Sequence, residues 1–424
     1  MGALTTSMMS VSRTRKAHNG LVGAFFIQGF LSLSYIPRIP ELIDQIHVSF
    51  ATWGLILGLA TIGGMLPLLM ANHFINRFGT RPVVQLMFTL VSLTMALYGF
   101  VDNGWMFFVL AFVQAFTMSF FNVAINSHSV VFQNRIGRII IGRFHAAWSI
   151  GAASASIVSG ALATVMPLRV YMMLVAGVAA IVLLIASAML LGPAEDGHEL
   201  EKKRAKSVGI FKTPKYVSIL AFGLFCGVMP ELSMMDWSAV FAKNALHLNP
   251  SQVGLPYTIF AISMIVARLS IGRLTRNRHL SSVASKAAII ASVAMALAVF
   301  IGPIVAGVDP MLAVLTTGIF WVIAGLGTGP QVPSYFSASG SVPGMSTAQA
   351  MSRMSLFNSI IILGAKVVMG ALAQGISVQV AFIFPITAYI VASVISSSVA
   401  KRGYKPEKVT GFPMTSPIDV IPED

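Results

Sequence analysis

Two carboxylates stand in an apolar segment of this sequence, and the chemistry open to them depends on what surrounds that segment. The segment is CGVMPELSMMDWSAVF, residues 226–241, and it contains Glu231 and Asp236. The chain has only 14 Asp and Glu residues in all, so two within one oily segment need a physical reason. A carboxylate in such surroundings can exchange a proton, pair with a base or contact a polar substrate.

The composition indicates that lipid is the main solvent. Hydrophobic residues make up 56% of the 424 residues, charged residues make up 10%, and the mean hydropathy is +0.82. Soluble domains carry about 25% charged residues, and about 20 apolar residues cross a bilayer as a helix. The sequence predicts an all-α membrane protein with twelve transmembrane helices in two pseudo-symmetric six-helix halves. The predicted spans are 18–38, 52–71, 82–100, 105–127, 143–165, 169–191, 215–237, 252–272, 283–306, 311–332, 350–373 and 378–400.

Basic residues gather at one set of span ends. One face of the twelve-span arrangement carries most of the Lys and Arg residues, and the other carries little beyond Arg38, Arg169 and Lys243. Since cytoplasmic loops of membrane proteins are enriched in Lys and Arg, we expect both termini in the cytoplasm. The net charge of +14 then follows from topology, and no nucleic-acid partner is needed to explain it.

The longest charged stretch lies between the sixth and seventh predicted spans, where a flexible linker is expected. It divides the chain into two halves with short tails. The expected parts are a cytoplasmic N-terminal tail (1–17), a six-helix half (18–192), a cytoplasmic linker (193–214), a second six-helix half (215–400) and a cytoplasmic C-terminal tail (401–424).

The two halves repeat one another in register. Gly54 aligns with Gly254 at the start of an apolar span, and Arg77 aligns with Arg273 at the basic turn that follows it. Internal repeats of this kind are typical of transporters whose substrate site lies between the halves.

Several enzyme and pump classes are excluded by missing motifs. The sequence has no Gly-x-x-x-x-Gly-Lys-[Ser/Thr] phosphate loop and no His-Glu-x-x-His zinc motif. Its one cysteine, Cys226, allows neither an internal disulfide nor a Cys-based metal cluster. We therefore expect no enzyme activity, no cofactor and no metal. The Gly-rich segment GLGTGPQVP, residues 325–333, contains two prolines and predicts a broken tenth helix instead of a phosphate cradle.

The loop NHFINRFGTRP, residues 72–82, resembles the signature G-x-x-x-D-R-x-G-R-[RK] of the major facilitator superfamily. Arg77, Gly79 and Arg81 match this signature, whereas Asn76 stands at the position of its acid. Three further stretches resemble the fucose-permease-like bacterial branch that includes the YbjJ-type inner-membrane proteins: SYIPRIPELIDQIHVSFATWGLILG, NVAINSHSVVFQNRIGRIIIGRFHAAWSIGA and PELSMMDWSAVF. The resemblance implies a carrier that works by alternating access in the bacterial inner membrane.

The departure at Asn76 has a consequence for the cytoplasmic gate. In the family the acid of this loop holds the gate through charge pairs with the other half, and an Asn can only form hydrogen bonds. The resemblance therefore implies a gate at Asn76, Arg77, Gly79, Arg81 and Arg273 that is looser than usual or latched by other groups.

Glu231 is expected on the transport path. It lies about 16 residues into the seventh span, roughly 24 Å along a helix axis, and an ionised side chain at such depth costs about 2.5–3.5 kcal/mol. The resemblance implies that helices one, four, seven and ten line the cavity. We expect Glu231 to be a proton- or substrate-coupled acid and Lys366 to pair with it or with the substrate. Arg38 and Asp236 are expected to close the outer gate together. The alternative is that these residues form static ion pairs that fix helix packing.

Three amides on the first and fourth spans allow two interpretations. Gln28, Asn122 and Asn126 could form hydrogen bonds with a polar substrate, or they could link helices, as membrane amides often do. His145, at the start of the fifth span, fits either a packing or a proton-linked role. The Gly, Ala and Ser residues that follow it predict a close helix contact.

These features together predict a secondary active transporter for a small polar organic solute, preferably a proton symporter. The fifth span lacks the proline of the Gly-Pro-rich motif found in the drug antiporters of this family, which favours import. The alternatives are a proton-coupled drug or metabolite efflux antiporter and, outside transport, a membrane receptor or channel. The expected partners are a small-molecule substrate, protons and the lipid bilayer, and the chain is expected to be a monomer.

Overall fold

The computed structural model describes residues 10–137, 140–196, 214–276, 278–340, 342, 345 and 347–401. The predictions for most of both tails and for most of the linker lie outside these ranges. Within them the regular structure is helical, with no strand.

The first half runs from α1 to α8. Its elements are α1 (Val11–Leu33), the 3-10 turn η1 (Ile36–Arg38), α2 (Ile39–Ile46), α3 (Phe50–Phe78), α4 (Thr80–Tyr98), α5 (Gly104–Ile136), α6 (Ile141–Leu162), α7 (Leu168–Met189) and α8 (Pro193–Asp196).

The second half runs from α9 to α16. Its elements are α9 (Lys215–Asn244), α10 (Leu255–Leu274), α11 (Leu280–Ala306), α12 (Pro310–Thr328), α13 (Gln331–Ser339), α14 (Thr347–Gly375), α15 (Val378–Ala381) and α16 (Ile383–Lys401).

Eleven helical stretches in the described residues are long and apolar enough to cross a membrane. Helix α6 has 22 residues but is not one of these stretches. Its sequence is rich in Gly, Ala and Ser, which lowers its hydropathy, and it packs against α1 in the first half and α10 in the second. The all-α, multi-pass fold predicted from hydropathy is thus confirmed.

Prolines account for two differences from simple spans. The first span ends as a helix at Leu33 and continues through η1 and α2, where Pro37 and Pro40 occupy the first turns. The predicted break in the tenth helix is confirmed, because α12 ends at Thr328 and α13 begins at Gln331, with Pro330 between them. Proline is favoured in the first turn of a helix, because the N–H that it lacks would have no partner there.

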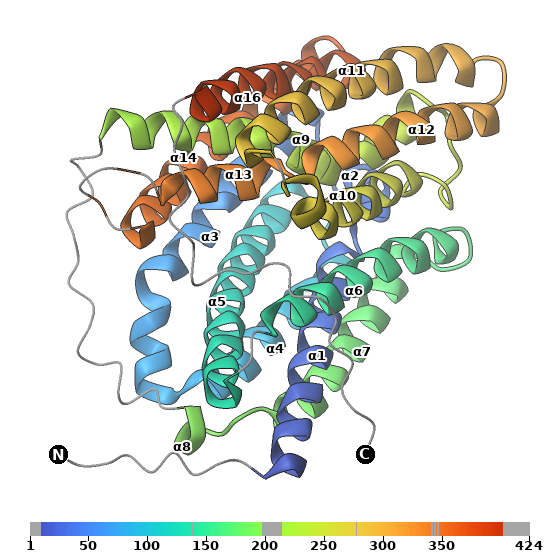
Figure 1. Cartoon of the computed structure of the whole chain (residues 1–424). Coiled ribbons are helices and arrows are strands. Elements are labelled where there is room, and N and C mark those ends of the chain that lie inside the picture. Colours follow the sequence, from blue (N-terminus) through green and yellow to red (C-terminus); the bar gives the residue numbers. More distant parts are fainter. Residues whose placement is uncertain are drawn as a thin grey trace.

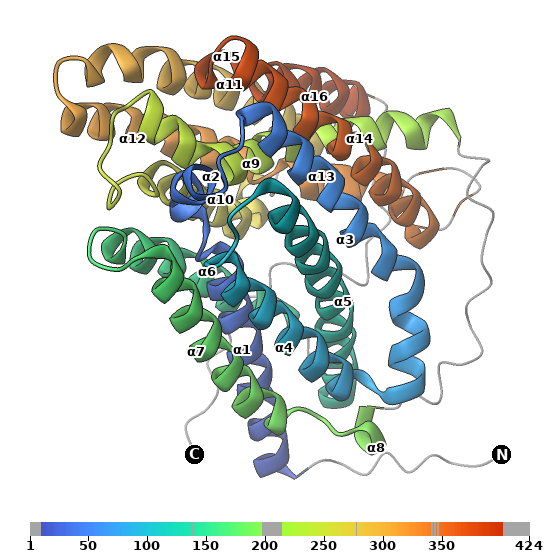
Figure 2. The same ribbon diagram turned by 180° about the vertical axis from the view of Figure 1, so that it is seen from behind.

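The two halves form separate bundles that run at a steep angle to each other (Figure 1). In that view α1 and α4–α7 fill the lower part and α9–α16 extend across the top; Figure 2 shows the same arrangement from behind. Several contacts in the described residues join the bundles: α3 packs against α14, α6 packs against α10, and α9 packs against η1 and α2. We call the first two of these contacts the α3–α14 seam and the α6–α10 seam.

The membrane-spanning helices run between two ends of the molecule, which we call the linker end and the closed end. The linker end holds the start of α1, the end of α3, the end of α7 and the start of α9, and the closed end holds the connections between α1 and α3, between α6 and α7 and between α9 and α10. The linker ends of the two bundles point in different directions, and the halves contact each other toward the closed end (Figures 1 and 2).

The internal repeat is visible in the backbone. His47 ends α2 and His247 follows α9, and both adopt the left-handed conformation with φ of 53°. Seven residues after each histidine stands one of the aligned glycines, and both glycines lie at a contact between the halves. A Cβ on Gly54 would meet the backbone of Gly370, and one on Gly254 would meet Pro37. The repeat therefore places equivalent glycines at the two seams.

Candidate functional site

Helix α9 carries both acids that the sequence singled out. It packs against α14, α16, α13 and α10, so that most of its surface is covered by the second half. Pro230 stands inside the helix, directly before Glu231, and the helix continues to Asn244 without a break. Asp236 follows Glu231 by five residues, which turns the two carboxylates to different neighbours on the helix surface.

Glu231 forms an ion pair with Arg268 of α10. Arg268 Nη2 donates to Glu231 Oε2 at 2.8 Å. The two side chains are 24% and 30% exposed, so the pair is partly accessible.

The pair lines a small cavity at the α6–α10 seam, of about 20 Å³. Leu33, Trp148 and Ser156 line the cavity from the first half, and Tyr257 lines it from α10. A volume of this size holds about one water molecule. Glu231 therefore faces the other half of the protein and not the lipid.

Asp236 forms the second ion pair of α9, with Lys366 of α14. Lys366 Nζ lies 2.8 Å from Asp236 Oδ2, and the side chains are only 16% and 7% exposed. Buried pairs of this kind hold their helices firmly, because neither charge can be left alone in a low dielectric. Helix α9 is thus tied to α10 through one acid and to α14 through the other, and each of these two partners forms one seam with the first half.

The predicted pairing of these charges is wrong. Lys366 pairs with Asp236 and not with Glu231, because the two acids point in different directions around α9 and Asp236 is the one that meets α14. Arg38 does not pair with Asp236 either. The 3-10 turn brings Arg38 back onto Glu41, where Nη2 donates to Oε2 at 2.7 Å and to the carbonyl oxygen of Met166 at 2.8 Å. Arg38 is completely buried within the first half.

Arg268 is the partner of Glu231 that the sequence analysis missed. It lies inside a predicted span, six residues before the end of α10, where a long side chain could also reach the aqueous boundary. Its position within an apolar segment was a signal of the same kind as that of Lys366. Which acid it meets depends on how α9 and α10 pack, and that information is tertiary.

The amides of the first half link its helices. Gln28 Nε2 donates to Asn122 Oδ1 between α1 and α5, and Gln28 is 3% exposed. Asn126 Nδ2 donates to the carbonyl oxygen of Asn122 at 2.8 Å, one turn back on the same helix. The bond from Gln28 supports the helix-linking interpretation for Gln28 and Asn122, whereas the bond of Asn126 stays within α5. Asn122 and Asn126 remain partly exposed.

The α3–α14 seam depends on glycines. A Cβ on Gly54 would lie 2.6 Å from Gly370 Cα and 2.7 Å from the carbonyl oxygen of Lys366. A Cβ on Gly58, one turn further, would lie 2.8 Å from the carbonyl oxygen of Leu363. Small residues at a spacing of four let membrane helices approach to backbone contact. The α3–α14 seam therefore includes the backbone of Lys366, the residue that pairs with Asp236.

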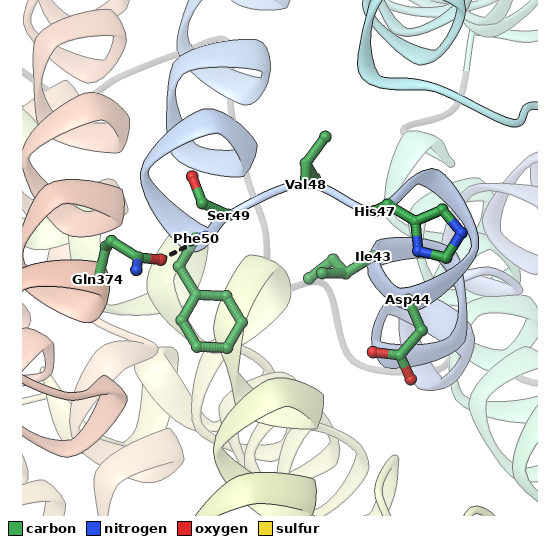
Figure 3. A pocket seen from close by; sticks show the side chains of 7 residues that line it. All are labelled: Ile43, Asp44, His47, Val48, Ser49, Phe50 and Gln374. Carbon is green, nitrogen blue, oxygen red and sulfur yellow. Dashed lines mark hydrogen bonds between the residues drawn. The ribbon is translucent and has the colours of Figure 1, made fainter.

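The closed end is held by polar and aromatic contacts between the halves. Lys243 Nζ lies 2.5 Å from Asp44 Oδ2, and the backbone N–H of Phe50 donates to Gln374 Oε1 at 3.0 Å. The rings of Phe50 and Trp237 meet edge to face at 6.0 Å. A surface pocket of about 500 Å³ lies at this junction, with Phe50 and Gln374 on one side and Asp44 on the other (Figure 3).

The predicted gate residues lie at the linker end. Arg77 and Arg273 occupy the last turns of α3 and α10 and are exposed, as their alignment in the repeat implies. Arg81 stands in the first turn of α4, and Asn76 is half-buried in the last turn of α3. Between them Gly79 adopts φ of 82°, a conformation that side chains rarely take.

A carboxylate does contact this loop, but it comes from the start of the linker. Asp196 Oδ2 accepts hydrogen bonds from the backbone N–H of Thr80 at 2.7 Å and from its hydroxyl at 2.9 Å. His128 Nε2 accepts from the backbone N–H of Leu191 at 3.2 Å, so Nδ1 carries the proton toward the Thr80 hydroxyl. Asp196 is 4% exposed and lies at the N-terminus of α4, where a negative charge is favoured.

Arg13 fixes the same segment from α1. Its guanidinium contacts both carboxylate oxygens of Glu195 and donates to the carbonyl oxygens of Met189 and Leu190 at 2.8 and 2.7 Å. The hydrogen bond from Arg13 lowers the pKa of Glu195 to about 2. The start of the linker is thus fastened to the first half by two neighbouring acids.

Comparison with known proteins agrees with this architecture. The sequence profile of the Major Facilitator Superfamily matches residues 21–344, which is most of the chain. The chain belongs to the Major Facilitator Superfamily. It is therefore a multi-pass membrane transporter.

Two curated relatives match large parts of the chain. An uncharacterised MFS-type transporter of Yersinia pestis is 27% identical over 362 residues, covering 85% of this chain and 89% of the relative. The uncharacterised transporter y4wD of Sinorhizobium fredii is 23% identical over 268 residues, covering 62% and 69%.

Solved structures share the fold. The nucleoside transporter NupG, in a mutant form, matches with a TM-score of 0.69 at 15% identity, covering 90% of this chain and 98% of that one. A bacterial homologue of the human lysosomal transporter Spinster, in an inward-facing and occupied conformation, matches with a TM-score of 0.68 at 14% identity, covering 90% and 96%.

Proposed function

We propose that this transporter is a proton-coupled symporter that carries a small polar organic solute into the cell by alternating access. The observation that carries the proposal is the Glu231–Arg268 pair, a partly exposed acid and base that line a cavity shared by both halves. Ionisable groups at membrane depth usually serve substrate or ion translocation, because they are costly to keep otherwise.

Glu231 is the proposed proton carrier. Its charge is balanced by a single base, Arg268, so protonation breaks one ion pair and changes the charge of the cavity by one unit. Asp236 suits this role less well, since its pair with Lys366 is more deeply buried and is attached to the α3–α14 seam. We assign Asp236 and Lys366 to holding α9 and α14 together as one moving unit.

The proposed orientation puts the linker end in the cytoplasm of the cell, at its inner membrane. Exposed bases at the linker end include Arg15, Arg77, Arg143, Arg273 and Lys401, whereas the closed end has Arg38, Arg169 and Lys243. This imbalance is typical of cytoplasmic faces. Since the halves contact each other toward the closed end, the conformation corresponds to one that opens inward.

The proposed cytoplasmic gate comprises Asn76, Arg77, Gly79, Arg81 and Arg273. Asp196 supplies the carboxylate for this loop from the linker, which supports a gate latched by other groups in place of the missing acid. The proposed outer gate consists of the Lys243–Asp44 pair and the Phe50 contacts; Arg38 is assigned to the scaffold of the first half.

The assignment to the fucose-permease-like branch, with its YbjJ-type proteins, remains a proposal based on the sequence stretches that resemble it. The proposed partners are a small-molecule substrate and the lipid bilayer. The proposed oligomeric state is a monomer. Gln28 is proposed to fix α1 against α5, and Asn122 and Asn126 to present their remaining polar groups to the path.

Uptake into proteoliposomes with an imposed pH gradient tests the proposal. For wild-type protein we expect accumulation of a solute from a panel of sugars, nucleosides and organic acids, driven by the gradient. Glu231→Gln should lose accumulation at least tenfold and keep exchange of labelled for unlabelled solute, because the carrier still cycles with a neutral side chain. Gradient-driven accumulation by the Gln variant at the wild-type level would refute the assignment of Glu231.

A further inference from the structure

We infer that the solute carried with the proton is a small organic anion, recognised through a carboxylate that replaces Glu231 on Arg268. This inference rests on the proposed proton-coupled function and adds the substrate class. It follows from counting the charges around the cavity in its two protonation states.

The cavity is neutral only while Glu231 is ionised. From the first half it is lined by uncharged groups, among them Leu33, Trp148, Ala152 and Ser156, so that half offers Arg268 no substitute anion. Asp236, the other acid of α9, is engaged by Lys366 at 2.8 Å. When Glu231 takes up a proton, Arg268 is left as an uncompensated cation.

The remaining titratable groups near Glu231 cannot restore the balance. Tyr257 of α10 shares the cavity with Glu231, and Tyr389 lies on α16, which also packs against α9. The Tyr389 hydroxyl is bonded to that of Thr328. Phenols are neutral at physiological pH, so neither group supplies a negative charge. Among the residues that the structure describes, no other acid lines the cavity, so an anion from outside these residues is what the protonated site lacks.

Arg268 has the donors to hold such an anion. Its bond to Glu231 uses Nη2, and a guanidinium has five N–H groups in a fork that matches a carboxylate in two-point geometry. Being 30% exposed, it can be reached without unfolding the helix. Trp148 and Tyr257 in the same cavity offer flat apolar surface to the organic part of the ligand. One proton and one monoanion then cross together without net charge.

Thermal stabilisation of the purified full-length chain by matched acid–amide pairs tests the inference. The probes are benzoate and benzamide, nicotinate and nicotinamide, and lactate and lactamide, each at pH 5.5 and pH 8. For wild-type protein we expect at least one acid to stabilise the fold, at lower concentration at pH 5.5, and its amide to have no effect. Glu231→Gln should bind that acid equally at both pH values, because its Arg268 is permanently without a partner.

Arg268→Gln should weaken binding of the acid at least tenfold, and Arg268→Lys should recover part of it. Arg276→Gln, at an exposed residue two positions beyond the end of the same helix, is the matched control and should bind as wild type does. Equal stabilisation by acid and amide, undiminished binding to Arg268→Gln, or failure of every acid to stabilise Glu231→Gln would overturn the inference.

Transport measurements separate this inference from the function on which it rests. Proton-driven uptake of a neutral sugar or nucleoside that depends on Glu231 would leave the symporter standing and refute the anionic substrate. Binding of an acid through Arg268 without any pH-driven uptake would support recognition of the anion and refute the proton symporter.

Discussion

The two halves share one fold but differ in how they treat polarity at membrane depth. The second half carries two ion pairs on α9, Glu231 with Arg268 and Asp236 with Lys366. At the corresponding depth, α1 of the first half forms a neutral amide bond, from Gln28 to Asn122. The repeat therefore preserves helix positions and seam glycines, while the two ion pairs at this depth belong to the second half.

The largest expected effect comes from breaking the buried pair of the second half. Lys366→Met leaves Asp236 without a partner at 7% exposure, and losing one partner of a buried pair costs about 3–5 kcal/mol. We expect a large loss of folded protein in the membrane, measured by the fluorescence of a fused reporter and by the melting temperature. Asp236→Asn combined with Lys366→Met should recover most of it. A single variant that is as stable as the double variant, or more stable, would show that the pair is not coupled.

The seam between the halves ranks next. Gly54→Ala inserts a methyl group 2.6 Å from Gly370 Cα, and overpacking of this kind costs about 1–3 kcal/mol. We expect a lower melting temperature and weaker closure at the closed end, measured as faster labelling of a cysteine introduced at Phe50. Gly364→Ala is the control on α14, because a Cβ there meets nothing within 4 Å. Identical behaviour of the two variants would contradict the seam.

The linker end should respond more weakly. Asp196→Ala removes the carboxylate from the N-terminus of α4, and loss of a capping side chain costs about 1 kcal/mol. Asp309→Ala is the matched change in the second half, since Asp309 caps α12 at the closed end. Both should lower the melting temperature similarly, but only Asp196→Ala should alter protease accessibility of the linker. Equal accessibility in the two variants would exclude a latch at Asp196.

The smallest effect is expected for the amide of the first half. Gln28→Ala removes one interhelical hydrogen bond, and such bonds contribute about 0.6 kcal/mol in membrane proteins. The melting temperature should fall slightly, and the pH dependence of transport should stay unchanged. A change in that pH dependence would mean that the first half takes part in proton coupling, against the comparison drawn above.

The architecture could be read from the sequence to a large extent, and the pairing of its charges could not. Span length and hydropathy depend on the bilayer, so they predict helices without any knowledge of contacts. The break at Pro330 follows from the chemistry of a single residue. Partners such as Arg268 for Glu231 depend on the crossing of α9 with α10, which a linear pattern does not contain.

Two kinds of local feature explain the other differences. Depth along a helix was a fair guide to which residues are buried, but it does not define direction around the axis, so Lys366 was matched to the wrong acid of α9. The hydrogen bond between Thr80 and Asp196 joins residues more than a hundred positions apart in sequence, and no residue near Asn76 predicts it. Small residues in α6 make it less apolar than the other spans, although its span was predicted, and they correctly indicated its close contact with α1, where Gly151 meets Phe26.

The most direct test of the account asks from which side water reaches position 231. Glu231→Cys in a Cys226→Ser background has a single thiol, because Cys226 is the one natural cysteine. A membrane-impermeant maleimide is applied to inside-out and to right-side-out vesicles, with the Cys226→Ser chain as the unlabelled control. The account predicts rapid labelling from the linker-end side and slow labelling from the closed-end side. A thiol that reacts only with a membrane-permeant reagent would mean that position 231 faces lipid or dry packing, and would contradict the account.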